Sequence, residues 1–215
     1  ALAQGLKVVV VHGGGPQINA EIKARGISSE FIGGFRVTNQ ETLDAVEHVL
    51  IGLVGPQIAD SLQAHSIPAR AISGRGVLSA TKLTQLVDGS SVDLGFVGDV
   101  TSVNAQEIIA ALSAGEVPVV SPVASDVDRD GALNINADLA AAAIAGALDA
   151  TSLIVMTDVA GIYRQWPDPD SLIEHISRDE LFSIKDTFTE GMAPKVSACL
   201  EAIDNGARAV RIIDG

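Results

Sequence analysis

Three consecutive glycines follow a run of valines near the start of the chain, in the stretch VVVVHGGGPQIN at residues 8–19. Glycine has no side chain, so the backbone of Gly13–Gly15 can approach a ligand closely. Pro16 is typical of the first turn of a helix, and the positive end of a helix dipole favours an anion. The stretch therefore predicts an anion-binding loop, although a plain tight turn between a strand and a helix would use the same residues.

Three common glycine loops can be tested against this stretch. A Walker phosphate loop ends in Gly-Lys-Ser or Gly-Lys-Thr, and no such ending follows the glycines here. A dinucleotide-binding loop needs a further glycine where this chain has Ile18. An α/β-hydrolase can bind an oxyanion with HGGG, but it also needs a Gly-x-Ser-x-Gly turn, which the sequence lacks. These three loops are disfavoured, which leaves an anion loop of another kind or a plain tight turn.

Two cations lie in stretches that could serve a negatively charged ligand. Arg36 stands in GGFRVT, and the fork of an arginine matches the two oxygens of a carboxylate. Taken alone, this stretch fits an ordinary surface arginine better. Lys195 in GMAPKV stands near the start of a helix, where the positive dipole end disfavours it unless an anion lies between. A solvated lysine is the simpler alternative.

Polar residues precede an alanine-rich helix in LNINADLAAAAIAGAL. Helix capping explains Asn136 as the N-cap and Asp138 as a favourable charge in the first turn. Capping does not explain Asn134, so ligand binding by this group stays open beside it.

Composition limits the class of protein. The chain has 215 residues, of which 47% are hydrophobic, and a formal net charge of −13. This length suffices for one large α/β domain or two closely packed lobes. The acidic balance argues against nucleic acid and against an anionic membrane as partners. No apolar run approaches the ~20 residues of a membrane helix, and the single cysteine, Cys199, fits a reducing compartment, so we expect a cytoplasmic protein.

Apolar runs alternate with helical patterns along most of the chain. Strands are expected at 8–11, 69–73, 117–121, 153–156 and 209–213, helices at 16–25, 42–65, 104–114, 136–148 and 194–206, and a β-hairpin at 77–97. A bend is expected in the second helix, at Gly55-Pro56. The repeated β-α-β order predicts an α/β fold with a mainly parallel central sheet covered by helices on both faces.

Ligands of such sheets bind outside the carboxyl ends of the strands. Four loops should therefore share one rim, at residues 13–15, 74–76, 121–126 and 158–163.

Taken in order, VVVVHGGGPQIN, GGFRVT, LNINADLAA, TDVAGIY and GMAPKV resemble the N-acetylglutamate kinase branch of the amino acid kinase family. The likeness runs along essentially the whole chain, and five motifs in one order are more specific than any one of them. The resemblance implies an αβα sandwich, with an amino-acid lobe at 1–148 and a nucleotide lobe at 149–215. It also implies transfer of the ATP γ-phosphate to the side-chain carboxylate of N-acetyl-L-glutamate, in arginine synthesis.

The resemblance implies roles for the matching residues at the substrate. The main-chain amides of Gly14 and Gly15 would hold the reacting carboxylate and the moving phosphoryl group. Arg36, Asn134 and Asn136 would bind the rest of N-acetyl-L-glutamate.

It implies further roles on the side of ATP. Asp138 would organise the catalytic lysines, and Lys195 would neutralise charge on the phosphates. The nucleotide would be surrounded by Asp158, Val159, Gly161, Ile162, Tyr163, Thr187, Phe188, Thr189, Met192 and Lys195. Mg²⁺ would be held mainly by ATP oxygens, so no dedicated protein metal site is expected. A carboxylate is already a nucleophile, so His12 would at most orient the glycine loop.

The sequence departs from the family pattern at both ends. The family's first strand carries a Lys-x-Gly-Gly element, which is not found before Ala1, and its closing strands are not found after RIIDG. We therefore expect a kinase core with a truncated nucleotide lobe. A non-catalytic binding module, or a kinase of acetylaminoadipate, glutamate or aspartate, is the alternative. A homodimer or a higher homo-oligomer is expected.

Overall fold

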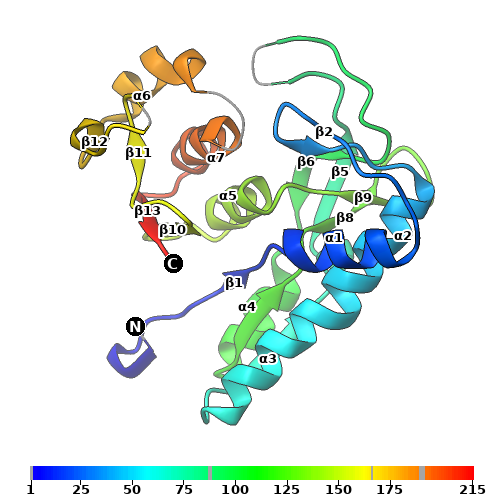
Figure 1. Ribbon diagram of the computed structural model, residues 1–215. Coiled ribbons are helices and arrows are strands. Elements are labelled where there is room, and N and C mark those ends of the chain that lie inside the picture. Colours follow the sequence, from blue (N-terminus) through cyan, green and yellow to red (C-terminus); the bar gives the residue numbers. More distant parts are fainter. Residues whose placement is uncertain (1, 87–88, 166, 189–191) are drawn as a thin grey trace.

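The computed structural model describes residues 2–86, 89–165, 167–188 and 192–215 (Figure 1). Helix α5 (Ala137–Ala147) lies in the middle of the molecule, between a larger part formed by the preceding residues and a smaller part formed by the following ones. The sequence predicted helix α5 to within a residue or two at each end.

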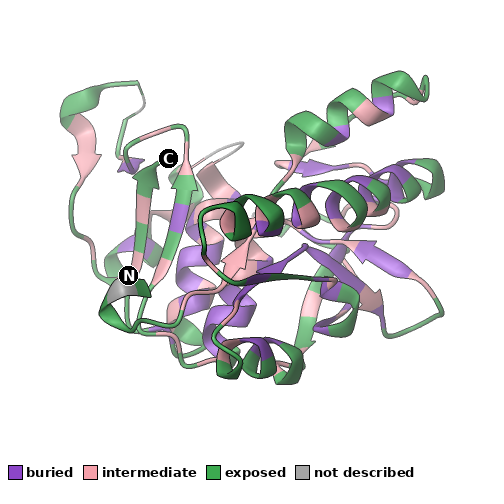
Figure 2. Ribbon diagram, turned by 90° about the horizontal axis from the view of Figure 1, so that it is seen from below, coloured by how far each residue is buried: buried purple, intermediate pink, exposed green. Residues whose placement is uncertain are grey.

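A parallel sheet of three strands forms the base of the larger part, in the order β1 (Val10–Val11), β7 (Val117–Val120) and β4 (Ala69–Ile72). Alternate side chains of these strands point to opposite faces. One face packs on helix α3 (Gly55–Ala64), and the other packs on α4 (Gln106–Ser113) and α5. Figure 2 shows the buried strands between these helices. The expected α/β fold with helices on both faces of a parallel sheet is confirmed here.

The four valines at 8–11 predicted a strand of that length, but β1 includes only Val10 and Val11. On the side of β4, the main-chain N–H groups of Val117 and Ser121 donate to the carbonyls of Pro68 and Ile72. Residues alternate along a strand, so Pro118 faces β1, and proline has no N–H to donate. The ladder with β1 therefore begins only at Val10.

A second sheet has the order β6 (Gly98–Val103), β5 (Leu78–Lys82), β8 (Val123–Asp126) and β9 (Ala132–Asn134), and most of its pairs are antiparallel. The hairpin expected at 77–97 exists, but its returning strand lies further along. The segment before that strand is held at Thr38, which donates to Leu94 O and accepts from Phe96 N. The predicted turn at 88–91 includes residues outside the described part of the chain. The central parallel sheet is therefore accompanied by several smaller sheets, which the sequence did not predict.

Helices α1 (Gly15–Ala24) and α2 (Gln40–Val49) cover the larger part, and α2 continues through a π-helical turn at Leu50–Val54 into α3. Asn39 caps α2 by accepting from Thr42 N. The predicted bend at Gly55-Pro56 appears as this π-helical turn, in which the Gly55 N–H reaches back to Leu50 O.

Between α1 and α2 the chain forms a short hairpin that the sequence did not predict. Its strands are β2 (Phe31–Ile32) and β3 (Phe35–Arg36), which pair antiparallel. Gly33 and Gly34 both have positive φ, of 58° and 85°, as a two-residue turn requires.

The smaller part contains the parallel pair β10 (Leu153–Thr157) and β13 (Val210–Asp214), and the antiparallel pair β11 (Ile162–Tyr163) and β12 (Leu172–Ile173). Its helices are α6 (Arg178–Ile184) and α7 (Met192–Asp204). Small residues let α5 and α7 pack closely: Ala142, Ala145, Ala198 and Ala202 are all buried in their interface. In the described residues, no helix combines the length and apolarity that crossing a bilayer requires.

Candidate active site

Three of the four predicted rim loops adjoin one another because β1, β7 and β4 are neighbours in one sheet. His12 N donates to Val120 O after β1, and Gly74 N donates to Ser121 Oγ at 3.2 Å. The fourth loop, at 158–163, follows β10 in the other sheet.

The glycine loop opens α1 as the sequence predicted. Gly14 is the N-cap and Gly15 is the first helical residue, so the amides of this turn have no partner within the helix. A Cβ at Gly14 would lie 2.7 Å from Leu50 Cδ2, so the π-helical turn leaves no room for a side chain there. A Cβ at Gly13 would lie 4.0 Å from Ala137 Cβ, which places the loop beside the start of α5.

His12 holds the glycine loop through a hydrogen bond to Gly13. Its Nδ1 lies 2.9 Å from Gly13 O, and a carbonyl only accepts, so Nδ1 carries the proton. Its Nε2 is buried without a partner in the described residues, and it lies 3.3 Å from the position of a Cβ at Gly55. Burial lowers the pKa of His12, and the bond to Gly13 only partly opposes this. A buried, neutral imidazole of this kind supports the loop.

The start of α5 carries both a cap and an ion pair. Asn136 Oδ1 accepts from Asp138 N at 2.9 Å and Leu139 N at 3.2 Å, which confirms its capping role. The Asp138 carboxylate turns to α7, where Lys195 Nζ donates to Asp138 Oδ2 at 2.9 Å. Both side chains are about one fifth exposed. Lys195 is therefore not an ordinary solvated lysine: it is held at the end of α5 that adjoins the glycine loop.

Arg36 is buried with 7% of its surface exposed, so the interpretation as a surface arginine is wrong. Its Nη2 donates to Asn19 Oδ1 at 2.7 Å, and its Nη1 donates to Ser29 Oγ. The guanidinium lies over the ring of Phe31, 4.5 Å from the centroid. Burial lowers the pKa of Arg36, and none of the ion pairs in the described residues involves it.

Asn134 is connected to the strand of Arg36 through one threonine. Asn134 Nδ2 donates to Thr38 Oγ1 at 3.2 Å, and Thr38 Oγ1 donates to Arg36 O at 2.8 Å. Thr38 is completely buried. Asn134 is thereby connected to the main-chain carbonyl of Arg36, not to its guanidinium.

The predicted nucleotide residues lie in the smaller part. Asp158 follows β10 and accepts from Thr157 Oγ1 at 3.1 Å, and Gly161 leads into β11. The Ile162 side chain is buried in the core between α6 and α7, against which Phe188 and Met192 also pack. Val159 lies in the turn before β11, and Tyr163 is the second residue of that strand. Thr187 Oγ1 donates to Ile184 O, and Thr189 is outside the described residues.

An open groove of 810 Å³ runs along β13, but it does not contain the anion-binding candidates. It is lined by Ile162, Arg178, Cys199 and Arg211 among others. Burial raises the pKa of Cys199 to about 12, so the thiol stays protonated. Of the predicted nucleotide residues Gly161 and Ile162 line this groove, whereas the predicted anion-binding residues lie around the glycine loop and α5.

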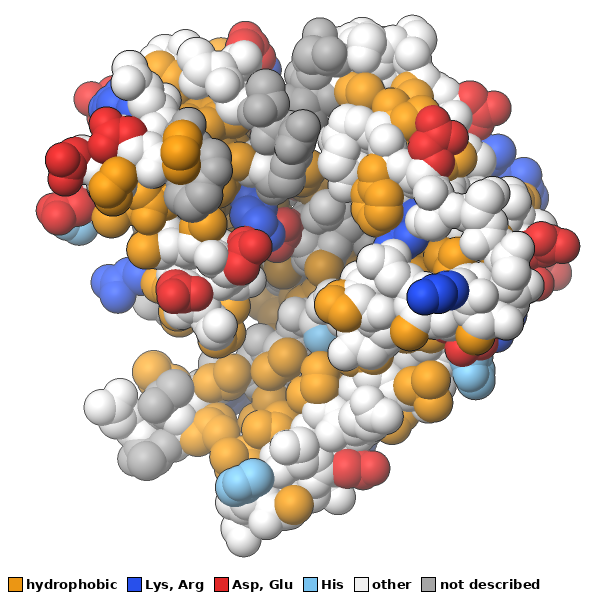
Figure 3. Space-filling model, viewed as in Figure 1, with side chains coloured by type: hydrophobic (Ala, Val, Ile, Leu, Met, Phe, Trp, Pro, Cys, Tyr) orange, Lys and Arg blue, Asp and Glu red, His pale blue; other side chains and the backbone are white. Residues whose placement is uncertain are grey.

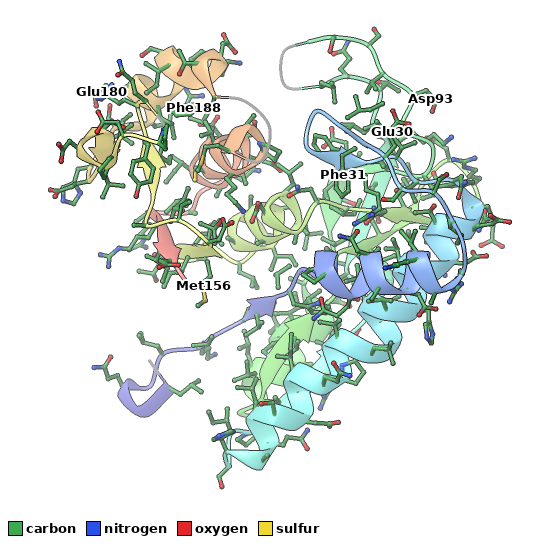
Figure 4. The ribbon with its side chains drawn as sticks, in the orientation of Figure 1. Glu30, Phe31, Asp93, Met156, Glu180 and Phe188 are labelled. Carbon is green, nitrogen blue, oxygen red and sulfur yellow. The ribbon has the colours of Figure 1, made fainter. Side chains whose placement is uncertain are left out.

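Figure 3 shows a recess between the larger and the smaller part, with basic side chains on both of its walls. In Figure 4, Phe31 lies on the side of the β2–β3 hairpin, and Phe188 lies on the opposite side. Over the described ranges, no group of three or more His, Cys, Asp or Glu side chains is placed to hold a metal ion.

Sequence reasoning missed the residues that support the site. Asn19 stands four residues after Gly15, hence on the same face of α1, and this helical spacing was the available signal. Ser29 and Phe31 gave no signal, because their role depends on a hairpin with only two residues in each strand.

Comparison with known proteins identifies the family of the chain. The model of the amino acid kinase family matches residues 1–214. The chain is 46% identical to an acetylglutamate kinase of Arthrobacter sp. (strain FB24), over 98% of this chain and 70% of that protein. It is 47% identical to an acetylglutamate kinase of Kineococcus radiotolerans, over 98% and 73%. The crystal structure of smu.665 from Streptococcus mutans UA159 superimposes with a TM-score of 0.84 at 29% identity, over 99% of this chain and 84% of that one.

Proposed function

The chain belongs to the amino acid kinase family, and from its similarity to acetylglutamate kinases we propose that it phosphorylates the side-chain carboxylate of N-acetyl-L-glutamate with ATP. A carboxylate oxygen attacks the γ-phosphorus, a new O–P bond forms, and the bond to the β-bridging oxygen breaks. The products are an acyl phosphate and ADP. The observation that carries the proposal is the Lys195–Asp138 pair, held at the end of α5 beside the glycine loop.

The reacting groups meet at that end of α5. The amides of Gly14 and Gly15 donate to the carboxylate and to the phosphoryl oxygens, where charge accumulates during transfer. Lys195, oriented by Asp138, faces the same charge from α7. Phosphoryl transfer depends mainly on positioning and charge stabilisation, so the attacking carboxylate needs no general base.

The other end of the substrate lies at Arg36. A buried guanidinium without an acidic partner is costly unless an anion joins it, and the α-carboxylate supplies that anion. Asn134, connected to the same strand through Thr38, donates to the acetamido group. The cap leaves Asn136 Nδ2 available to the substrate as well.

ATP occupies the recess on the side of the smaller part. The turn at 158–163 and, of the described residues, Thr187, Phe188 and Met192 surround it, through main-chain atoms where side chains such as Ile162 are buried. Mg²⁺ is a hard cation that keeps phosphate and water ligands, so it reaches the site on the nucleotide. The amino-acid lobe then corresponds to 1–148 and the nucleotide lobe to 149–215.

The biological setting belongs to the same proposal. The reaction is a step of arginine biosynthesis, carried out in the cytoplasm by a homodimer or a higher homo-oligomer. The single cysteine, protonated and buried, suits a reducing compartment. Light scattering of the purified protein measures the number of subunits.

Another kinase of the family is the second candidate, acting on acetylaminoadipate, glutamate or aspartate. Similarity to acetylglutamate kinases favours an N-acylated substrate, and Asn134, whose amide keeps a second N–H beyond the bond to Thr38, supports it as a donor to the acyl oxygen. ADP release, measured by a coupled assay with each amino acid in turn, separates these substrates. The proposal expects N-acetyl-L-glutamate to give the highest kcat/KM, and preference for a free amino acid would contradict it.

A further inference from the structure

The guanidinium of Arg36 is enclosed by uncharged groups. Asn19 Oδ1 accepts from Nη2 at 2.7 Å, Ser29 Oγ accepts from Nη1, and the Phe31 ring covers one face. Phe31 is also the residue opposite Arg36 in the β2–β3 ladder, so the hairpin itself brings the two together. These neighbours come from α1, from the loop after it and from β2.

This environment differs from that of five other arginines of the described chain. Each of those is more exposed and forms an ion pair: Arg25 with Glu21, Arg70 with Glu116, Arg75 with Glu47, Arg129 with Asp126 and Arg178 with Asp204. Arg36 is buried, and its hydrogen-bond acceptors carry no charge. Within the described part of the chain, no acidic side chain therefore neutralises this positive charge.

We propose that Asn19 and Ser29 are positioning residues that determine carboxylate specificity, because they hold Arg36 in place without neutralising it. This inference rests on the proposed function. A guanidinium has five N–H groups, and the two acceptors occupy one on each terminal nitrogen, which leaves three for a ligand. A bidentate carboxylate needs two of these. A charged residue in place of Asn19 would compete for them.

The position of Asn19 on α1 also relates the two ends of the substrate. Asn19 stands one helical turn after Gly15 and on the same face, an advance of about 6 Å along the axis. The glycine amides belong to the start of α1, and the Arg36 guanidinium, which comes from β3, is hydrogen-bonded to the same helix through Asn19. Three carbon atoms separate the two carboxylates of a glutamate, so a dicarboxylate of this length can reach both.

The experiment compares Asn19→Asp, Asn19→Ala and Ser29→Ala with Arg36→Ala as a reference. Ala20→Asp is the matched control, since Ala20 is exposed and the same charge there points about 100° away around the helix. For each variant the KM of N-acetyl-L-glutamate, the KM of ATP, kcat and the Tm are measured, and titration calorimetry gives the Kd of N-acetyl-L-glutamate.

Asn19→Asp should raise the KM and the Kd of N-acetyl-L-glutamate at least tenfold, because its carboxylate takes the place of the substrate's. Asn19→Ala and Ser29→Ala should raise them several-fold, through loss of orientation. The KM of ATP should stay within twofold and the Tm should not fall in Asn19→Asp, whose new ion pair replaces a hydrogen bond. Ala20→Asp should leave all constants within twofold.

Two outcomes distinguish a failure of this inference from a failure of the proposed function. If Arg36→Ala raises the KM of N-acetyl-L-glutamate but the Asn19 and Ser29 variants do not, this inference is wrong and the proposed function stands. If Arg36→Ala itself leaves that KM and Kd unchanged, the carboxylate site of the proposed function is wrong as well. Equal changes in both KM values together with a lower Tm would mean that the two residues only stabilise the fold.

Discussion

Lys195 Nζ on α7 lies 2.9 Å from Asp138 Oδ2 at the start of α5, although 57 positions separate the two residues in the chain. The pair joins the two parts of the molecule directly beside the glycine loop. Asp138 therefore fixes a cation at the place where a phosphoryl group would carry its charge.

Replacing Asp138 should impair turnover more than binding. Asp138→Asn keeps the shape of the side chain but removes the charge that orients Lys195, so kcat should fall at least tenfold. Lys195→Ala should lower kcat by about 10²–10³, as expected for loss of one preorganised donor. Steady-state kinetics of the two single variants and of the double variant test this.

The double variant is the internal control. Residues that act as one unit have effects that do not add, so it should be little slower than Lys195→Ala alone. Additive losses would mean that Asp138 acts on something other than Lys195, and an unchanged kcat in Lys195→Ala would make it a structural lysine.

The glycine loop should tolerate a side chain at one position and not at its neighbour. A Cβ at Gly14 would lie 2.7 Å from Cδ2 of Leu50, and the Leu50 side chain is itself buried. Gly14→Ala should therefore destabilise the protein by about 1–3 kcal/mol. A Cβ at Gly15 meets nothing within 4 Å, so Gly15→Ala should leave the free energy of unfolding nearly unchanged. Urea denaturation of both variants measures the difference, and equal stability would contradict the packing described here.

The contact between α5 and α7 should depend on a single glycine. A Cβ at Gly146 would lie 2.4 Å from Asn205 Cβ and 3.0 Å from its carbonyl oxygen, which is backbone and cannot rotate away. Gly146→Ala should therefore lower the Tm by several degrees, given about 2–4 °C per kcal/mol for a chain of this size. Gly52→Ala is the control, because its Cβ would meet only His48 Nδ1 at an ordinary 3.8 Å. A Tm that does not fall in Gly146→Ala would refute the close approach.

Stability should also depend on one carboxyl group of α7. Burial, and secondarily the charge of Asp99, raises the pKa of Glu201 to about 7. The folded state then keeps a proton that the unfolded state releases above its ordinary pKa, so the free energy of unfolding falls as pH rises from about 4.5 to 7. Glu201→Gln should be more stable than the parent by about 1–3 kcal/mol at pH 8 and equal to it at pH 4.5. A difference that does not change with pH would show that Glu201 has an ordinary pKa.

The local signals of the sequence predicted most elements and the capping of α5. Asn136 was identified as an N-cap by its residue type, and the structure shows both bonds. The glycine loop was found because consecutive glycines between a strand and a helix-starting proline are visible in the sequence itself. Such features depend on neighbours in the chain, which a sequence displays directly.

The remaining features depend on contacts between distant residues. Arg36 looked like a surface residue because Phe31, Ser29 and Asn19 enclose it only after the hairpin and α1 have come together. The extent of β1 depended on Pro118, which lies more than a hundred residues further along. Neither could be predicted from hydrophobic periodicity, because that pattern reports burial and not the partner.

The central claim is that the side-chain carboxylate of N-acetyl-L-glutamate receives the phosphoryl group, and its product can be detected directly. An acyl phosphate reacts with hydroxylamine to give a hydroxamate, which mass spectrometry identifies. With ATP, Mg²⁺ and N-acetyl-L-glutamate, we expect N-acetylglutamyl hydroxamate in proportion to the ADP formed. ADP release without any hydroxamate, or hydroxamate formed preferentially from free glutamate or aspartate, would contradict it.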